Sequence, residues 1–192
     1  MVVTLDLHPT VELTDEQFER ICRANRNLKL ERTAKGELVI MALTGGETGR
    51  RNLRLTGQLW FWNQQSNLGE GFDSSTGFRL PNGAIRSPDA AWVRLDRWQA
   101  LTSEQRKKFV PLCPDFVVEL ASPSDELEDI REKMLEYLAN GLRLGWLIDP
   151  STQTVEIYRP NQPVEILNQP ATLSGENILP EFVLNLTGIL TD

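Results

Sequence analysis

Residues 114–149, PDFVVELASPSDELEDIREKMLEYLANGLRLGWLID, contain the pattern that decides the fold. The apolar run at 114–121 predicts a strand, and Ser124 is placed to cap a helix that runs from Asp125 to about Asn140. The apolar segment 143–149 predicts a second strand after that helix. Two strands joined through a helix form a βαβ unit, which requires the strands to lie parallel within a mixed sheet.

The segments outside this unit predict further helices and strands. Thr14 is placed to cap a short amphipathic helix at 14–26, and the apolar spacing of 47–63 predicts a longer helix. Residues 97–109 are expected to form a helix or an insertion over the sheet edge. The other expected strands lie at 28–30, 38–41, 72–80, 85–95 and 154–159. The order predicts an α/β fold, a mixed β-sheet flanked by helices, in one domain spanning 1–192.

The composition argues against several kinds of site. Two cysteines, Cys22 and Cys113, make no disulfide framework, and the single histidine, His8, argues against a zinc site and against histidine-dependent nucleophilic catalysis. The net charge of −7 argues against nucleic-acid binding by bulk electrostatics alone, although acids that hold a divalent metal contribute negative charge themselves. Because no signal peptide and no run of membrane-spanning length is evident, we expect a cytoplasmic protein without membrane contact.

Glu119 stands inside an apolar strand, where a carboxylate must be neutralised, paired or held near a metal. Asp115 and Glu119 share one face of that strand, since side chains alternate. Asp89 follows Pro88 at the start of another strand, and two carboxylates brought close need a cation such as Mg²⁺ between them. As alternatives, Asp89 is a turn-capping acid and Glu119 belongs to a buried ion pair, while Asp115 is better interpreted as a structural acid at the strand edge.

Lys133 lies on one helical stripe with Asp129 and Tyr137, four residues from each. From spacing alone, a solvent-exposed pair of Asp129 and Lys133, worth about 0.3–0.5 kcal/mol, is the favoured interpretation. If the stripe instead faces Glu119, Lys133 would orient an attacking water or stabilise developing phosphate charge, and Tyr137 would position the group.

The stretches SPDAAWV and CPDFVVELASPSDELEDIREKMLEYLANGLRLGWLIDP, with the hairpin KGELVIMAL and the following GGETG, resemble the restriction endonuclease-like family of the PD-(D/E)XK nuclease superfamily. The likeness runs from about residue 28 to the tail and is most specific over 114–150. It implies a restriction endonuclease-like core and a metal-dependent phosphodiesterase, with Asp89 and Glu119 as ligands of Mg²⁺ or Mn²⁺.

The resemblance also assigns roles to residues that depart from the common pattern. The superfamily lysine stands two residues after the acid, where this chain has Ala121, but related sequences carry the lysine on the following helix, where Lys133 matches. Glu47 is implied as an accessory acid, although Thr48 stands where family members often carry a histidine. The implied activity is hydrolysis of DNA phosphodiester bonds at Asp89 and Glu119.

A different function class stays open at this point. The chain could be a catalytically inactive binding or scaffold protein on a nuclease fold, and we expect a homodimer in either case. Three arginines of the helix at 47–63 could contact phosphates or form a solvated face. They are Arg50, Arg51 and Arg54. Aromatic side chains are enriched at interfaces, and five tryptophans are available. They are Trp60, Trp62, Trp92, Trp98 and Trp146.

Overall fold

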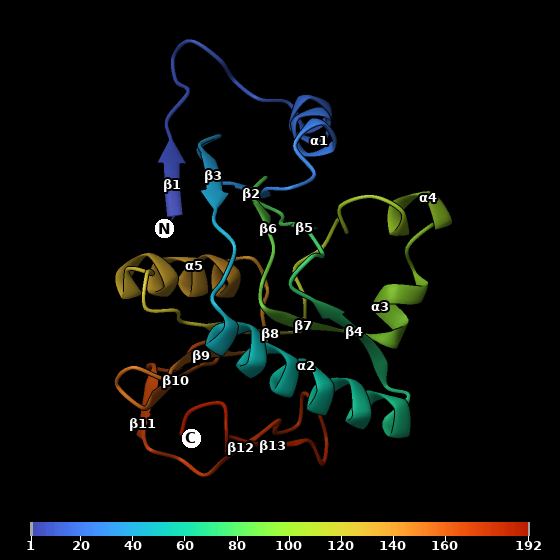
Figure 1. Ribbon diagram of the computed structural model, residues 1–192. Coiled ribbons are helices and arrows are strands. Elements are labelled where there is room, and N and C mark those ends of the chain that lie inside the picture. Colours follow the sequence, from blue (N-terminus) through green and yellow to red (C-terminus); the bar gives the residue numbers. More distant parts are fainter. Residues whose placement is uncertain (1, 192) are drawn as a thin grey trace.

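A six-stranded mixed sheet forms the centre of the protein, which is described by a computed structural model over residues 2–191 (Figure 1). In their order across the sheet, the strands are β11 (Glu165–Asn168), β10 (Thr154–Tyr158), β9 (Leu144–Asp149), β8 (Phe116–Leu120), β7 (Ala90–Arg94) and β4 (Gly69–Asp73). Only β8 and β9 pair in parallel within this sheet, and α5 (Leu127–Ala139) connects them. The predicted βαβ unit and mixed sheet are confirmed.

A second, antiparallel sheet lies next to the first, at the top of Figure 1. Its strands are β1 (Val2–Leu5), β3 (Leu38–Met41), β2 (Lys29–Arg32), β6 (Ile85–Arg86) and β5 (Phe78–Arg79). A small pair near the C-terminus is formed by β12 (Thr172–Ser174) and β13 (Val183–Asn185). The chain crosses from the smaller sheet to the larger one between β6 and β7, at Ser87-Pro88-Asp89.

The helices are α1 (Asp15–Ala24), α2 (Gly46–Ser66), α3 (Leu95–Gln99), α4 (Ser103–Arg106) and α5. Helices α2 and α5 cover opposite faces of the larger sheet, whereas α1 packs against the smaller sheet. The apolar side of α2 packs with Phe116 and Val118 of β8, whereas Met134 of α5 packs in the cluster that contains Val117. Because alternate residues of β8 enter opposite clusters, odd-numbered positions such as Glu119 belong to the face that α5 covers. Within residues 2–191, no helix has the length and apolar character that crossing a membrane requires.

Two of the expected strands are wrong in extent. The segment 72–80 is divided, because a turn closed by Asp73 separates β4 from β5 and the two strands join different sheets. The segment 85–95 is divided at Pro88, which has no N–H to offer a ladder, and its last residue already begins α3. The segment 97–109 contributes to two short helices, α3 and α4.

The start of α5 also differs from the expectation. Ser124 does not cap the helix, since α5 begins at Leu127 with Glu126 as its N-cap residue. The carboxylate of Asp125 accepts hydrogen bonds from the backbone N and the Oγ of Ser122, at 2.9 and 2.8 Å, and so closes a turn before the helix can start. The predicted cap of α1, at Thr14, is confirmed as a capping box.

Candidate active site

A cleft of about 720 Å³ opens between the smaller sheet, the N-terminal end of α2 and the side of α5. Asp89, Glu119 and Lys133 all line it, and they come from the β6–β7 crossing, the end of β8 and the middle of α5. The elements that carry them meet near the centre of Figure 1. The structure therefore brings together three of the predicted site residues, which are 30 and 14 positions apart in the sequence.

Asp89 is fixed by contacts with two other elements. Its Oδ2 accepts a hydrogen bond from the backbone N of Leu120 at 2.9 Å, and its Oδ1 accepts one from Nδ2 of Asn52 on α2 at 3.4 Å. Because Leu120 directly follows Glu119, the first bond fixes the Asp89 carboxylate at the end of β8. A turn-capping role does not account for this contact between two separate strands.

Glu119 is buried, with 7 % of its surface exposed. Its Oε1 lies 2.8 Å from Nζ of Lys133 and accepts a hydrogen bond from the hydroxyl of Tyr137 at 3.1 Å. Burial raises the pKa of Glu119 to about 7, with Asp89 and Glu31 adding to the rise and Lys133 opposing it. An additional cation would favour the ionised form of this carboxyl group.

Lys133 lies between two carboxylates and is not the exposed partner of Asp129. Its Nζ lies 2.9 Å from Oε1 of Glu31 as well as 2.8 Å from Oε1 of Glu119. Burial opposes its charge, but Glu119 and Glu31 outweigh that effect and raise the pKa of Lys133 above its usual range. Lys133 is therefore an ammonium ion at neutral pH, which suits it to electrostatic stabilisation rather than to proton abstraction. The prediction of a surface pair with Asp129 is wrong, because Lys133 is mostly buried.

Glu31, on β2, is the main residue of the site that the sequence did not indicate. It is 2 % exposed and is held by Lys133, by Nη1 of Arg86 at 3.2 Å and by the backbone N of Ser87 at 2.8 Å. Burial disfavours its ionisation, but Lys133 and Arg86 outweigh this and lower the pKa of Glu31. Arg86 is also paired, through Nε, with Glu136 of α5 at 2.5 Å.

Two further predicted residues lie at different depths. Tyr137 is fully buried and donates a hydrogen bond from its hydroxyl to Glu119, so it contacts the site from the protein interior and does not line the cleft. Its pKa is raised, first by burial and then by Glu119 and Glu31. Glu47, at the start of α2, lines the cleft with its side chain 70 % exposed and pairs with Arg50 at 2.8 Å.

The arginines of α2 are not equivalent. Arg51 lines the cleft, whereas Arg54 donates a hydrogen bond to the carbonyl of Thr187, at 3.3 Å, in the C-terminal segment. Arg50 pairs with Glu47 near the mouth of the cleft. Arg51 is therefore the arginine of this helix that the structure places in the cleft.

Asp115 has the structural role that was its favoured interpretation. It is buried one residue before β8, accepts a hydrogen bond from the backbone N of Arg94 at 2.9 Å and pairs with Arg97 at 3.0 Å. It does not line the cleft. At one end of β8, Asp115 is neutralised by Arg97. At the other end, Glu119 pairs with Lys133, which it shares with Glu31, and is therefore incompletely neutralised.

The residues around Asp89 and Glu119 fit a hard divalent cation. Both side chains offer carboxylate oxygens, and Oδ1 of the neighbouring Asn52 is a buried oxygen with no hydrogen-bond partner among residues 2–191. Within the same residues, no group of three or more His, Cys, Asp or Glu side chains is arranged to hold a metal. Mg²⁺ binds through one or two carboxylates and retains several waters, so two acids and an amide oxygen suffice for it.

Comparisons with known proteins agree with this architecture. Residues 15–187 match the sequence model of the Uma2 family, which is described as "Putative restriction endonuclease". A crystal structure described as a "putative nuclease belonging to DUF820" from Anabaena variabilis ATCC 29413 superposes with a TM-score of 0.71, at 19% sequence identity, over 84% of this chain and 89% of that chain. At this identity the likeness shows the fold, and the expected restriction endonuclease-like fold is confirmed. No curated protein matches the sequence.

Proposed function

The chain belongs to the Uma2 family of restriction endonuclease-like proteins, and from this premise we propose that it is a metal-dependent endonuclease that hydrolyses phosphodiester bonds in DNA. The observation that carries the proposal is the convergence of Asp89, Glu119 and Lys133 on one cleft. Two acids and an amine from separate elements, brought together around the buried Glu119, are a costly arrangement that packing alone does not require.

Asp89 and Glu119, with the amide oxygen of Asn52, would hold Mg²⁺ or Mn²⁺. When bound, the metal supplies an acidified water molecule and a Lewis acid for the phosphoryl oxygen. Lys133 contributes a fixed positive charge within 2.8 Å of Glu119, placed to stabilise the negative charge that develops on the phosphate. Tyr137 keeps the Glu119 carboxylate oriented through its hydroxyl.

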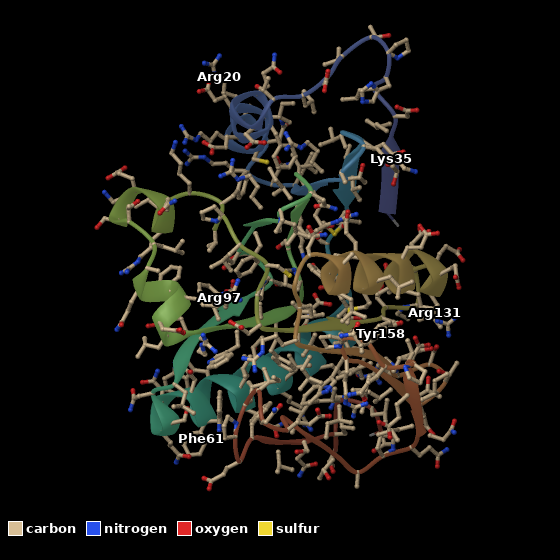
Figure 2. All side chains as sticks on the ribbon, turned by 180° about the vertical axis from the view of Figure 1, so that it is seen from behind. Arg20, Lys35, Phe61, Arg97, Arg131 and Tyr158 are labelled. Carbon is tan, nitrogen blue, oxygen red and sulfur yellow. The ribbon has the colours of Figure 1, made fainter. Side chains whose placement is uncertain are left out.

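The rest of the cleft supplies contacts for a DNA strand. Apart from Arg86 and Lys133, which pair with Glu31, three basic residues line it, namely Lys29 of β2, Lys35 of the hairpin turn and Arg51 of α2. Figure 2 shows Lys35 on the smaller sheet, above α5. Acids outnumber these groups in the lining, so a cation at Asp89 and Glu119 is also needed to make the cleft attractive to phosphate. Glu47, at the cleft mouth, is the proposed accessory acid.

The proposal is tested by metal binding and DNA nicking in parallel. We expect calorimetry to detect Mn²⁺ binding to the wild type and its loss in Glu119→Gln, and we expect Mg²⁺ to support plasmid nicking only in the wild type. Lys133→Ala should bind Mn²⁺ but fail to nick. Asp115→Asn is the matched control, because Asp115 is a buried acid next to the same strand but outside the cleft. Equal heats from the wild type and Glu119→Gln would overturn the metal site.

A catalytically inactive binding protein on the same fold is the second candidate function. Trp60 and Phe61 of α2 favour it, because these two aromatic side chains are largely exposed. This candidate predicts that the wild type leaves plasmid DNA intact with Mg²⁺ and with Mn²⁺. Nicking that disappears in Glu119→Gln would exclude it.

A further inference from the structure

Glu31 and Glu119 hold the same ammonium group but differ in what else they contact. Oε1 of Glu31 accepts from both Lys133 and the backbone N of Ser87, and its Oε2 faces Arg86. Three donors, from α5, from β6 and from the β6–β7 crossing, therefore saturate and neutralise this carboxylate. Within the described residues, both side-chain partners of Glu119 use its Oε1. Glu119 is thus the acid that has capacity left for a ligand.

A cation bound at Glu119 would repel the ammonium of Lys133, since like charges at such distances oppose each other strongly in a buried site. If Glu119 were the only partner, Lys133 would be displaced toward solvent when the metal binds. Glu31 provides a second carboxylate 2.9 Å away, on a different sheet. Its bond to Ser87, two residues before Asp89, also ties the position of the lysine to the segment that presents Asp89.

We infer that Glu31 is a positioning residue, which retains Lys133 in the cleft when Glu119 is engaged by a divalent cation. This inference rests on the proposed function and deepens it. Glu31 itself acts through Lys133, because its oxygens are occupied by Lys133, Arg86 and Ser87. Without Glu31, the lysine depends on Glu119 alone and competes with the metal for that carboxylate.

The test is a double-mutant cycle on Mn²⁺ affinity, measured by calorimetry. Glu31→Gln keeps an acceptor for Ser87 but removes the charge, and we expect the Kd for Mn²⁺ to rise about tenfold. In a Lys133→Met background, the same substitution should leave Kd unchanged, because no ammonium is left to compete. Glu136→Gln is the matched control, since Glu136 pairs with Arg86, whereas the ion pairs of Lys133 within the described residues are with Glu31 and Glu119, and it should bind Mn²⁺ as the wild type does.

Each outcome has a distinct meaning. An unchanged Kd in Glu31→Gln, or an equal rise in both backgrounds, overturns the positioning role while the metal site stands. Absence of Mn²⁺ binding to the wild type overturns the positioning role together with the proposed function. If Glu31→Gln does not fold, Glu31→Asp retains the charge but withdraws the carboxylate by one methylene. A smaller rise in Kd that again vanishes with Lys133→Met is then the supporting result.

An independent observation concerns the outer face of α2. Leu53, Trp60 and Phe61 are 73 %, 61 % and 60 % exposed, and helical spacing places them on one side of the helix. Figure 2 shows Phe61 at the periphery of the molecule, far from the smaller sheet that carries Lys35. Gly57 lies between them, four residues from Leu53 and from Phe61, and a Cβ there would meet nothing within 4 Å.

This face fits a second copy of the chain. A two-fold axis through Gly57 brings the two helices close and places Leu53 of one copy opposite Phe61 of the other. Taking about 200 Å² for a large aromatic side chain, Trp60 and Phe61 of two copies expose roughly 500 Å². That is about half of the apolar area in a standard interface of about 1,600 Å². Two chains of net charge −7 repel each other overall. Because Glu47 is the one acid of α2, this repulsion is weaker where the α2 faces of two copies meet.

We propose that the outer face of α2 joins two copies into a homodimer. Light scattering coupled to size-exclusion chromatography should give a dimer for the wild type and a monomer for Phe61→Glu. The matched control is Leu135→Glu on α5, because Leu135 is also half-exposed and should leave the dimer intact. A monomeric wild type at 100 μM (on the order of the weakest stable dimers) overturns the proposal. The proposal is also overturned if Leu135→Glu dissociates the dimer as much as Phe61→Glu does. It is overturned as well if the protein is a monomer whose α2 face binds single-stranded DNA.

Discussion

Replacing Glu119 with glutamine is expected to stabilise the metal-free protein at pH 8 and to change its stability little at pH 5. Burial raises the pKa of Glu119 from 4.5 to about 7, helped by Asp89 and Glu31 and opposed by Lys133. Between pH 4.5 and about pH 7, the Glu119 carboxyl group loses its proton in the unfolded chain but keeps it in the folded protein. The wild type therefore loses stability as pH rises from about 4.5 to 7 and regains it as pH falls.

The magnitude follows from the two pKa values. At about 1.4 kcal/mol for each pH unit, the difference between 4.5 and about 7 corresponds to roughly 3 kcal/mol of unfolding free energy. Glutamine does not titrate, so Glu119→Gln lacks this loss. At pH 5 the Glu119 carboxyl group is mostly protonated in the folded protein and resembles the amide, so the two proteins should differ little there.

Urea unfolding followed by tryptophan fluorescence, with EDTA present, measures the effect. The quantity of interest is the difference in unfolding free energy between Glu119→Gln and the wild type at pH 8, minus the same difference at pH 5. We expect it to be roughly 2.5 kcal/mol, because a small part of the total loss has already occurred at pH 5. Adding Mg²⁺ at pH 8 should stabilise the wild type alone. If the two proteins show the same pH dependence, Glu119 does not carry a raised pKa and the reasoning fails.

Other side chains give predictions of different kinds. Met134 of α5 is fully buried against the sheet, so Met134→Ala should lower the unfolding free energy in urea by about 2–5 kcal/mol, and a loss well below that would contradict the packing. Burial raises the pKa of Cys113 to about 12, so a thiol reagent at pH 8 should label half-buried Cys22 in the native protein and Cys113 only after unfolding; equal rates would be inconsistent with this. Burial opposes ionisation of Asp149, but hydrogen bonds from residues 151–152 outweigh it and lower its pKa. Asp149→Asn should therefore be destabilised at pH 7, and the deficit should shrink as pH falls through the lowered pKa; a deficit independent of pH would argue against this.

The parts of the fold that sequence predicted well depend on local patterns. The run at 114–149 contains a strand, a helix and a strand in succession, and a right-handed crossover leaves few ways to arrange them. The division of 72–80 and 85–95 was not predictable in the same way. Both segments pass between two sheets, and which sheet a strand joins depends on partners far along the chain, as β6 pairs with β2.

The same distinction applies to the candidate site. Asp89 and Glu119 were indicated by their unusual settings and by the family resemblance, whereas spacing alone favoured an exposed pair for Lys133. Glu31 gave no signal, because its partner Lys133 is 102 positions away and the contact exists only once the smaller sheet packs beside α5. Its strand, KLER, reads as an ordinary strand of alternating polarity.

The balance of buried charge gives the strongest physical reason to expect a cation in the cleft. Asp115 shows that this fold can neutralise a buried acid fully, since Arg97 and a backbone N–H are aimed at it. At the other end of the strand, Lys133 is shared between Glu31 and Glu119, and Asp89 raises the pKa of Glu119 further. The excess of negative charge lies at Asp89 and Glu119. A purely structural site would be more stable with an apolar side chain in place of Glu119, and an acid at this position therefore supports the proposal that a cation binds there.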